Sequence, residues 1–235
     1  MAHPGVFGSS LARKYAMALT GLFLCLFLAG HLAGNLQLFN TGPDGPQKFN
    51  EYARFMTTFP AVKVLSYLTY LSVLLHIVDG ILLTRGNRKA RPVRYARELG
   101  SANSAWNSRN MGVLGTIILV FLVTHMQNFW YVMHFGEVPV MYTAAGDELK
   151  DLHSVVLAFF NPALNSWALG AVVLYVAAQA ALALHLLHGF ESAFQSMGVR
   201  HPRYTPWIKS AGKVFSIGVP AGFAALPIFL YLIQL

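Results

Sequence analysis

Five long apolar segments with few charged residues constrain the fold of this chain more than any other feature. They cover about residues 15–39, 62–84, 110–135, 165–194 and 209–235. A helix needs about 20 apolar residues to cross a bilayer, and inside lipid every backbone hydrogen bond must be made within the chain. Charged residues make up 11% of the sequence, against about 25% in soluble domains. The sequence therefore predicts an all-α integral membrane protein with five transmembrane helices, in a single domain over residues 1–235.

Proline and asparagine residues modify this pattern at two places. Asn161 and Pro162 interrupt the apolar stretch before the fourth helix, so residues 152–160 are predicted to form a short interfacial piece. Pro220 and Pro227 are predicted to kink the fifth helix.

Lysine and arginine residues divide sharply between the two sides of the predicted helices. They precede the first helix at Arg13 and Lys14, and they fill the connections 85–109 and 200–213. Only four basic residues fall on the other side: Lys48, Arg54, Lys63 and Lys150. The positive-inside rule therefore places the N-terminus in the cytoplasm and the C-terminus outside. A cytoplasmic surface rich in Lys and Arg accounts for the net charge of +8, so the charge does not call for a nucleic-acid partner.

The only cysteine, Cys25, lies in the first apolar segment. A single cysteine excludes a disulfide framework, a cysteine-ligated zinc site and an iron–sulfur cluster within this chain. We expect Cys25 to be a buried core thiol.

Four histidines stand singly in the first four apolar segments. An ionisable side chain within a membrane helix is costly and by default marks a function. His31 lies 18 residues after Arg13 and His125 lies 16 residues after Arg109, which places them roughly 27 Å and 24 Å from the cytoplasmic end at about 1.5 Å per residue. These two histidines match in depth, in the outer half of the membrane.

The other two histidines match in the inner half. His76 lies 9 residues before Arg85 and His185 lies 10 residues before Gln195, which is roughly 14 Å and 15 Å from the cytoplasmic end. Two histidines per iron are the ligand set of a six-coordinate haem. The sequence therefore predicts an outer haem held by His31 and His125 and an inner haem held by His76 and His185. The alternative for each single histidine is a hydrogen bond between helices.

Small residues surround these histidines, among them Gly30, Gly34, Gly80 and Gly189. They would leave room for a porphyrin, although small residues also let membrane helices pack closely without a cofactor.

The remaining histidines divide into two groups. His188 follows His185 by three residues on a nearby helix face and is a candidate haem neighbour. His134 follows His125 by nine residues, about 180° round an α-helix, and lies beside Trp130 and Tyr131 at an aromatic belt position. His3, His153 and His201 are expected to be solvated, in loops or at segment ends.

The whole chain resembles the single-chain, five-helix, dihaem cytochrome b subunit that anchors bacterial succinate dehydrogenase or fumarate reductase in the membrane. The resemblance rests on four motifs: His31 in GHLAGN, His76 in HIVDG, His125 in THMQNFW and His185 in HLLHGF. In that family, one histidine from each of the first four helices ligates two b haems, with helix one paired with three and helix two with four.

The resemblance implies partners and a location. A flavoprotein subunit, which carries the succinate site, and an iron–sulfur subunit would dock on the cytoplasmic face of a bacterial inner membrane. A higher oligomer of the complex is left open. Electrons would pass from the iron–sulfur subunit through the two haems to a quinone, by resemblance menaquinone. Arg85, Arg88 and Lys89 would be partners of the inner haem propionates, and the same basic surface would also contact anionic lipid.

The quinone site has two candidate locations, because quinone reduction needs a proton donor near the ring. A site at the outer end would use Glu51, Arg54, Trp130, Tyr131, His134 or Glu137. A site at the inner end would use Asp79, Glu191 or His188. Asp79 lies about one turn from His76 and belongs either to a proton path or to an ion pair with Arg85. The resemblance favours the outer end.

Two other functions compete with this hypothesis. A dihaem cytochrome b subunit of another respiratory dehydrogenase or hydrogenase would keep the histidine chemistry and change the partner. A proton-coupled transporter with histidine relays would bind no haem, and the lack of an inverted repeat with broken helices counts against it.

Overall fold

The computed structural model describes residues 9–90 and 105–235. His3 and the middle of the basic connection 85–109 lie outside the described residues.

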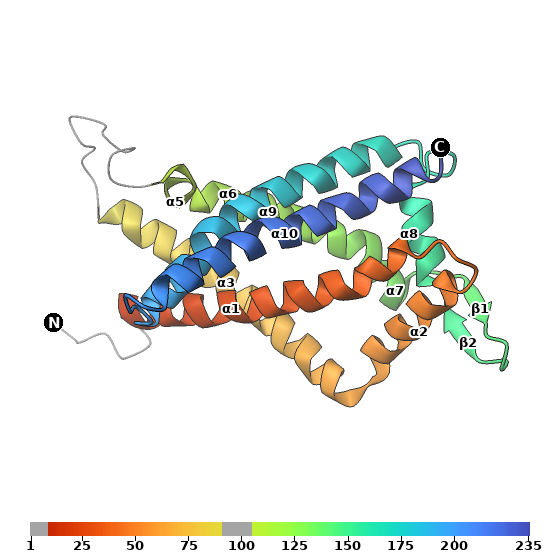
Figure 1. The fold of residues 1–235 in the computed structure, drawn as a ribbon, viewed down its shortest axis with the longest axis horizontal. Helices are drawn as coiled ribbons and strands as arrows, with labels where there is room; N and C mark the ends of the chain where they lie inside the picture. The colour runs from red at the N-terminus through yellow and green to blue at the C-terminus, as the bar shows by residue number, and fades with distance from the viewer. Residues whose placement is uncertain (1–8, 91–104) are drawn as a thin grey trace. The chain divides into compact units, whose positions relative to one another are not determined.

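Five helices in the described part of the chain are long and apolar enough to cross a membrane, which confirms the predicted class of an all-α membrane protein. Four of them are α1 (Ser10–Asn35), α3 (Pro60–Lys89), α9 (Ala168–Ser196) and α10 (Thr205–Leu232) (Figure 1). The third span combines α6 (Met111–His125), a π-helical turn η3 (Met126–Tyr131) and α7 (Val132–Phe135). The first span continues from α1 into a 3₁₀ turn, η2 (Leu36–Phe39).

The predicted short piece before the fourth span is α8 (Leu152–Phe160). Asp151 caps its first turn by accepting a hydrogen bond from the Ser154 amide. The helix ends at Asn161, whose extended backbone is the conformation favoured before a proline. Pro220 and Pro227, at which the sequence predicts kinks in the fifth span, both lie inside α10, and the helix continues through them.

Several elements between the spans have no counterpart among the sequence predictions. These are α2 (Gly45–Thr58), α5 (Trp106–Arg109) and a hairpin of β1 (Val140–Tyr142) and β2 (Glu148–Lys150). The two strands pair antiparallel with Met141 opposite Leu149. Gly146 turns the chain between them with φ of 86°, a conformation that suits glycine.

The chain divides into two compact units, and each is described by itself. Unit 1 comprises Met1–Phe27, Leu68–Ile117 and Ala181–Ile217, and unit 2 comprises Leu28–Tyr67, Ile118–Ala180 and Gly218–Leu235. Unit 1 therefore contains His76 and His185, and unit 2 contains His31 and His125.

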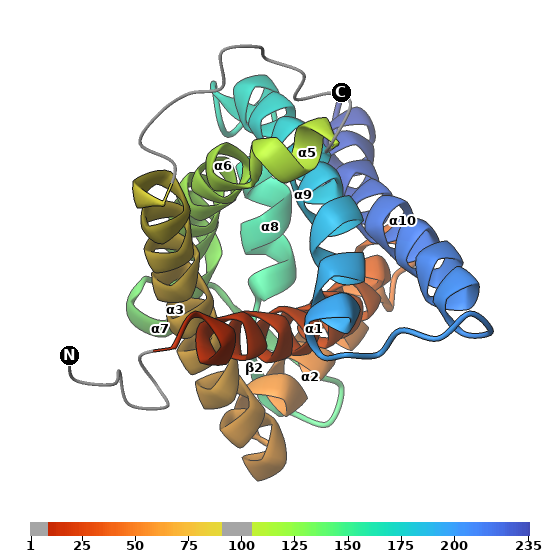
Figure 2. The same cartoon turned by 90° about the vertical axis from the view of Figure 1, so that its left-hand side faces the viewer.

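The core of unit 2 joins the beginning of α9 to the end of α10. Ala171, Val172 and Tyr175 of α9 pack in one buried cluster with Leu226 and Leu230 of α10, and the two helices lie side by side in both views (Figures 1 and 2). Phe49 of α2 and Phe160 of α8 complete this cluster. Elements between the spans are thus anchored to the same core.

Unit 1 packs mainly through small side chains. Its buried residues include Ala18, Ala181 and Ala193, which let helices approach closely. Gly212 is required for contact between α9 and α10, because a Cβ there would lie 2.7 Å from the Phe190 ring.

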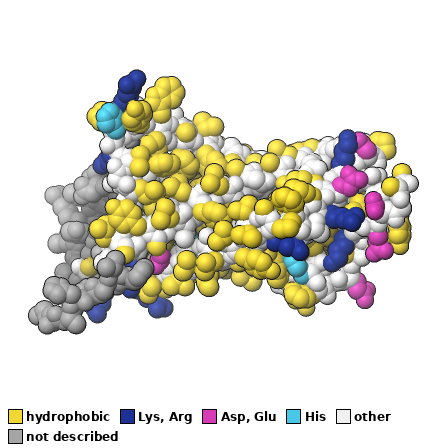
Figure 3. Space-filling model, turned by 90° about the horizontal axis from the view of Figure 1, so that it is seen from below, with side chains coloured by type: hydrophobic (Ala, Val, Ile, Leu, Met, Phe, Trp, Pro, Cys, Tyr) yellow, Lys and Arg dark blue, Asp and Glu magenta, His cyan; other side chains and the backbone are white. Residues whose placement is uncertain are grey.

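Hydrophobic side chains also cover most of the face shown in Figure 3. On α3, Val64 is 59% exposed and Tyr67 is 70% exposed. Exposed apolar surface on this scale would be a liability in water, and it is the surface that lipid contacts in a membrane.

Candidate functional site

The four span histidines form two pairs, one in each unit. In unit 2, the rings of His31 on α1 and His125 at the end of α6 have centres 6.0 Å apart, and their planes are nearly perpendicular at 86°. In unit 1, the rings of His76 on α3 and His185 on α9 have centres 6.3 Å apart at 65°. The pairs that the depth argument predicts are the pairs that lie together.

Both separations suit two ligands of one iron. An imidazole nitrogen binds a metal at about 2 Å and lies roughly 1 Å from the centre of its ring, so imidazoles on opposite sides of one iron have centres about 6 Å apart. Edge-to-face contact between neutral rings covers the same range of distances. The ring separations therefore fit haem ligation without requiring it.

Two ring nitrogen atoms of the pairs are consistent with a bound group. Nδ1 of His125 and Nδ1 of His185 are buried and have no hydrogen-bond partner among the described residues. A buried polar atom without a partner costs about 1–3 kcal/mol, so native proteins rarely leave one unsatisfied. Either ring nitrogen of a neutral histidine can bind a metal. These atoms therefore fit a site that takes a bound group.

Aromatic side chains enclose the His31–His125 pair. Around His125, Phe121 lies at 5.6 Å, Phe129 at 5.3 Å and Tyr175 at 6.0 Å between ring centres. Phe223 of α10 lies 5.5 Å from the His31 ring. This apolar shell excludes water from the pair, and such a shell controls the potential of a bound metal.

Glycines lie against the His76–His185 pair. A Cβ at Gly21 would lie 3.3 Å from Cε1 of His76, and one at Gly115 would lie 3.9 Å from Cε1 of His185. The backbones of α1 and α6 thus approach the two rings closely. Of the glycines singled out in the sequence, Gly30 and Gly189 have nothing within 4 Å of a Cβ position. Gly34 instead serves packing, since its Cβ would lie 2.6 Å from the Tyr52 ring.

The predicted inner-end residues lie in unit 1. His188 is half-buried one turn after His185, and Asp79 is half-buried one turn after His76. Asp79 and Arg85, both in the described chain, form no ion pair with each other. Arg85, Arg88 and Lys89 are exposed at the C-terminal end of α3.

The predicted outer-end residues separate into two groups. Trp130 and His134 form the first group, with ring centres 4.4 Å apart, and Nδ1 of His134 lies 2.7 Å from the carbonyl oxygen of Trp130. Tyr131 instead stacks toward Phe135, at 5.4 Å. The π-helical turn that holds Trp130 accommodates an extra residue, so His134 is rotated by about 100° from its place in an uninterrupted α-helix.

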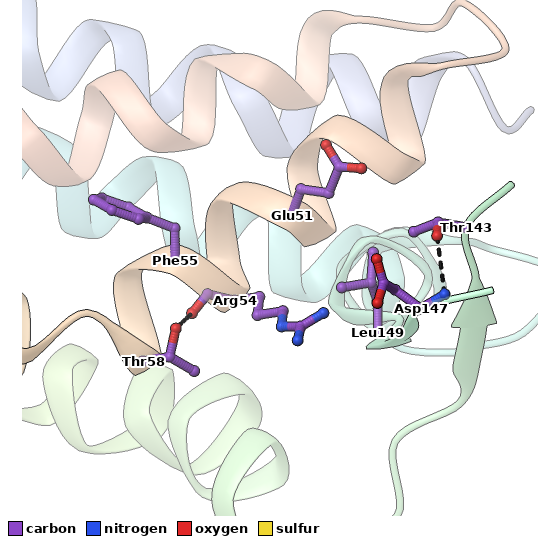
Figure 4. Close-up of a pocket in the computed structure, with 7 residues that line it drawn as sticks. All are labelled: Glu51, Arg54, Phe55, Thr58, Thr143, Asp147 and Leu149. Carbon is purple, nitrogen blue, oxygen red and sulfur yellow. Dashed lines mark hydrogen bonds between the residues drawn. The ribbon is translucent and has the colours of Figure 1, made fainter. Parts of the chain in front are cut away.

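Glu51 and Arg54 form the second group, in a pocket of about 330 Å³. Glu51, Arg54, Phe55 and Thr58 come from α2, and Thr143, Asp147 and Leu149 come from the hairpin (Figure 4). Figure 4 shows the Arg54 side chain extending from α2 toward the hairpin. Glu51 accepts a hydrogen bond from Gln47 at 2.7 Å. Trp130, Tyr131 and His134 do not line this pocket.

The expectation that His153 is solvated is wrong. It is 8% exposed on α8, and its ring lies 5.8 Å from that of Phe49. Burial lowers the pKa of the His153 ring, and the nearby Asp151 carboxylate opposes that shift. The sequence places His153 at the start of the short piece 152–160, and the expectation failed because α2, which covers this residue, was not predicted. His201 is exposed, as expected.

Sequence reasoning missed one polar neighbour of the histidine pairs. Thr20 on α1 places its hydroxyl oxygen 3.2 Å from Nδ1 of His76. No local signal identifies this threonine, because its partner lies 56 residues away in the chain.

The described residues contain no cluster of three or more His, Cys, Asp or Glu side chains that could hold a metal ion. This does not bear on haem, whose porphyrin supplies four ligands and leaves two for the protein.

Comparisons of this chain with protein-family models, with curated proteins and with solved structures find no match. The paired histidines and the membrane spans therefore carry the functional argument.

Proposed function

We propose that this chain is the membrane-anchor cytochrome b subunit of a bacterial succinate:quinone oxidoreductase. The observation that carries the proposal is the pairing of one histidine from each of the first four spans, at ring separations of 6.0 Å and 6.3 Å. The family resemblance of the four motifs supports the same assignment.

The histidine pairs fit two haems b, one per unit. Each haem iron, when bound, takes up and releases one electron. His31 and His125 would hold one haem, and His76 and His185 the other. The residues of the chain would bind and orient the groups: Gly21 lets the α1 backbone approach His76, and Phe121 and Phe129 keep water from His125.

The quinone, proposed to be menaquinone, requires protons as well as electrons. His134 supplies one candidate group, because a carbonyl only accepts hydrogen bonds and Nδ1 must therefore carry the proton it shares with Trp130. In the neutral ring, Nε2 then holds the lone pair, so His134 would take up a proton there and pass it to the quinone. Glu51, exposed in the pocket with Arg54, is the second candidate. Asp79 is the candidate for an inner site.

The partners would bind at the cytoplasmic ends of the helices. The exposed side chains of Arg85, Arg88 and Lys89 form a basic surface there. Such a surface suits an iron–sulfur subunit that docks beside the membrane, and it also suits anionic lipid headgroups. The flavoprotein subunit would carry the succinate site, since nothing in this chain resembles one.

Purification of the tagged chain from its native membrane tests the partner assignment. We expect a flavoprotein and an iron–sulfur protein to co-purify with it, and the complex to reduce a quinone analogue when succinate is added. Co-purification with a hydrogenase or formate dehydrogenase would assign the chain to another respiratory enzyme. A haem-free chain that purifies alone would favour the transporter.

A further inference from the structure

Thr20 contacts one of the four paired histidines directly. It lies on α1 within unit 1, and its Oγ1 is 3.2 Å from Nδ1 of His76 on α3. The same hydroxyl is 2.8 Å from the carbonyl oxygen of Ala16, one turn earlier on α1. The carbonyl oxygen of Met17 lies 3.3 Å from the hydroxyl as well. A carbonyl oxygen can only accept, and that of Ala16 is the shortest of the three contacts, so we assign the threonine proton to Ala16.

The direction of the second hydrogen bond follows. A hydroxyl has one proton and two lone pairs, so with its proton on a backbone carbonyl, Thr20 Oγ1 accepts from Nδ1–H of His76. A neutral imidazole protonated at Nδ1 carries its lone pair at Nε2. Gly21, the next residue, brings the α1 backbone against the same edge of the ring, because a Cβ there would lie 3.3 Å from Cε1 and 3.8 Å from Nδ1 of His76.

We infer that Thr20 is a positioning residue that sets the tautomer of His76 and presents Nε2 to the haem iron of the His76–His185 pair. This inference rests on the proposed function. Histidines that ligate metals typically donate their other N–H to an acceptor, which fixes the ring and makes it a more basic ligand. Thr20 supplies such an acceptor from the neighbouring helix α1, where the backbone of Met17 is a second hydrogen-bond partner of the His76 ring.

This hydrogen bond distinguishes His76 from His185, the other proposed ligand of the same haem. Nδ1 of His185 has no partner within the described chain, and neither has Nδ1 of His125 in the other pair. A change at Thr20 should therefore alter the His76–His185 haem and leave the His31–His125 haem unchanged. A more basic ligand stabilises the oxidised iron, so loss of the hydrogen bond raises the midpoint potential.

Two substitutions and one control test the inference. Thr20→Val removes the hydroxyl at nearly constant volume, and Thr20→Ser keeps it. Thr116→Val on α6 removes a hydroxyl that bonds only within its own helix, to Gly112. Each variant is purified as the full complex, its haem content is measured, and both haems are titrated potentiometrically with low-temperature spectra.

We expect Thr20→Val to raise the potential of the His76–His185 haem and shift its spectrum, with the other haem unchanged. Thr20→Ser and Thr116→Val should match the wild type. Loss of the same haem in Thr20→Val but not in Thr20→Ser would also support the role of the hydroxyl.

Two results would overturn the inference. One is Thr20→Val with both haems bound at wild-type potentials, and the other is equal loss of haem in the Val and Ser variants, which would assign Thr20 to packing alone. Absence of haem from the wild type is a different outcome, since it refutes the proposed function itself.

Discussion

Single histidines within apolar spans carry the functional argument at the residue scale. Their pairing followed from counting along the chain, because an α-helix rises by a constant 1.5 Å or so per residue. Side-chain partners such as Thr20 did not follow, because the rotation of one helix against another is set by packing. Which histidines lie together was thus predictable from the sequence, whereas the hydrogen bond that orients a ring was not.

Removal of one histidine should remove one haem. We expect His76→Ala or His185→Ala to lose the haem of that pair and to retain the other at least in part, because the pairs belong to different units. Haem content per polypeptide and the reduced-minus-oxidised spectrum report the loss. His134→Ala, a histidine outside both pairs, is the control and should keep two haems. If His76→Ala lost only the His31–His125 haem, the pairing would be wrong.

The lowered pKa of Asp151 predicts that the stability of the folded chain depends on pH. Burial raises its pKa, but hydrogen bonds from Ser154 and Asn50 outweigh burial, so the pKa of Asp151 lies below the usual 3.8. The unfolded chain therefore binds a proton at higher pH than the folded chain, and the stabilisation is present at neutral pH and lost as pH falls below 3.8.

Asp151→Ala should cost about 1 kcal/mol at pH 7, as loss of a helix cap usually does. Asp151→Asn keeps a capping oxygen and cannot titrate. Thermal unfolding in detergent between pH 3 and pH 7 should show the gap between wild type and Asp151→Ala closing at low pH. A gap that stayed constant down to pH 3 would contradict the assignment.

At the element scale, length and apolar content predicted the helices that could span the membrane. They also predicted α8, because Asn161 and Pro162 end it. No residue in the sequence indicates the π-helical turn η3, since its residues Met126–Tyr131 are compatible with an ordinary α-helix. As a result, the expectation that His134 lies about 180° from His125 does not hold.

Helix α2 escaped prediction for a different reason. It is too short and too polar to be a membrane span, although its apolar residues Phe49, Tyr52, Ala53 and Met56 recur at helical spacing. Its buried residues are Gly45, Phe49 and Asn50. Asn50 is 1% exposed and joins α2 to α8: its Nδ2 donates to Asp151 Oδ1 at 2.8 Å, and its Oδ1 accepts from the His153 amide at 2.9 Å. A buried polar bridge of this kind has no signature in apolar periodicity.

Asn50→Ala should therefore loosen α2 from α8. Loss of both bonds leaves the buried His153 amide unsatisfied, which costs about 1–3 kcal/mol. Limited proteolysis should cut within residues 45–58 faster than in the wild type, while the haem content stays unchanged. Thr57→Ala, an exposed position of the same helix, is the control. Equal cleavage rates in the two variants would show that the bridge does not hold α2.

At the scale of the whole molecule, charge and apolar length together predict how the chain lies in a membrane. The number of spans follows from composition. The predicted orientation rests on the basic residues near Arg13, Arg88 and Lys209, and it would place Asp147 and Glu148 outside the cell.

Accessibility labelling tests this orientation. In a Cys25→Ala background, which removes the only cysteine, an impermeant thiol reagent added to intact spheroplasts should label Glu148→Cys and not Arg88→Cys. Lysis should make Arg88→Cys reactive, which controls for folding and access. The reverse pattern would place the N-terminus outside.

The central claim is that the two histidine pairs hold two haems, and its most direct test is haem stoichiometry. The purified, folded chain from haem-replete cells is measured by a dithionite-reduced minus oxidised spectrum and a haem assay per polypeptide. The paired geometry predicts two b-type haems per chain. A folded, haem-replete preparation without haem would contradict the claim and leave the histidines as hydrogen-bonding or proton-relay groups between helices.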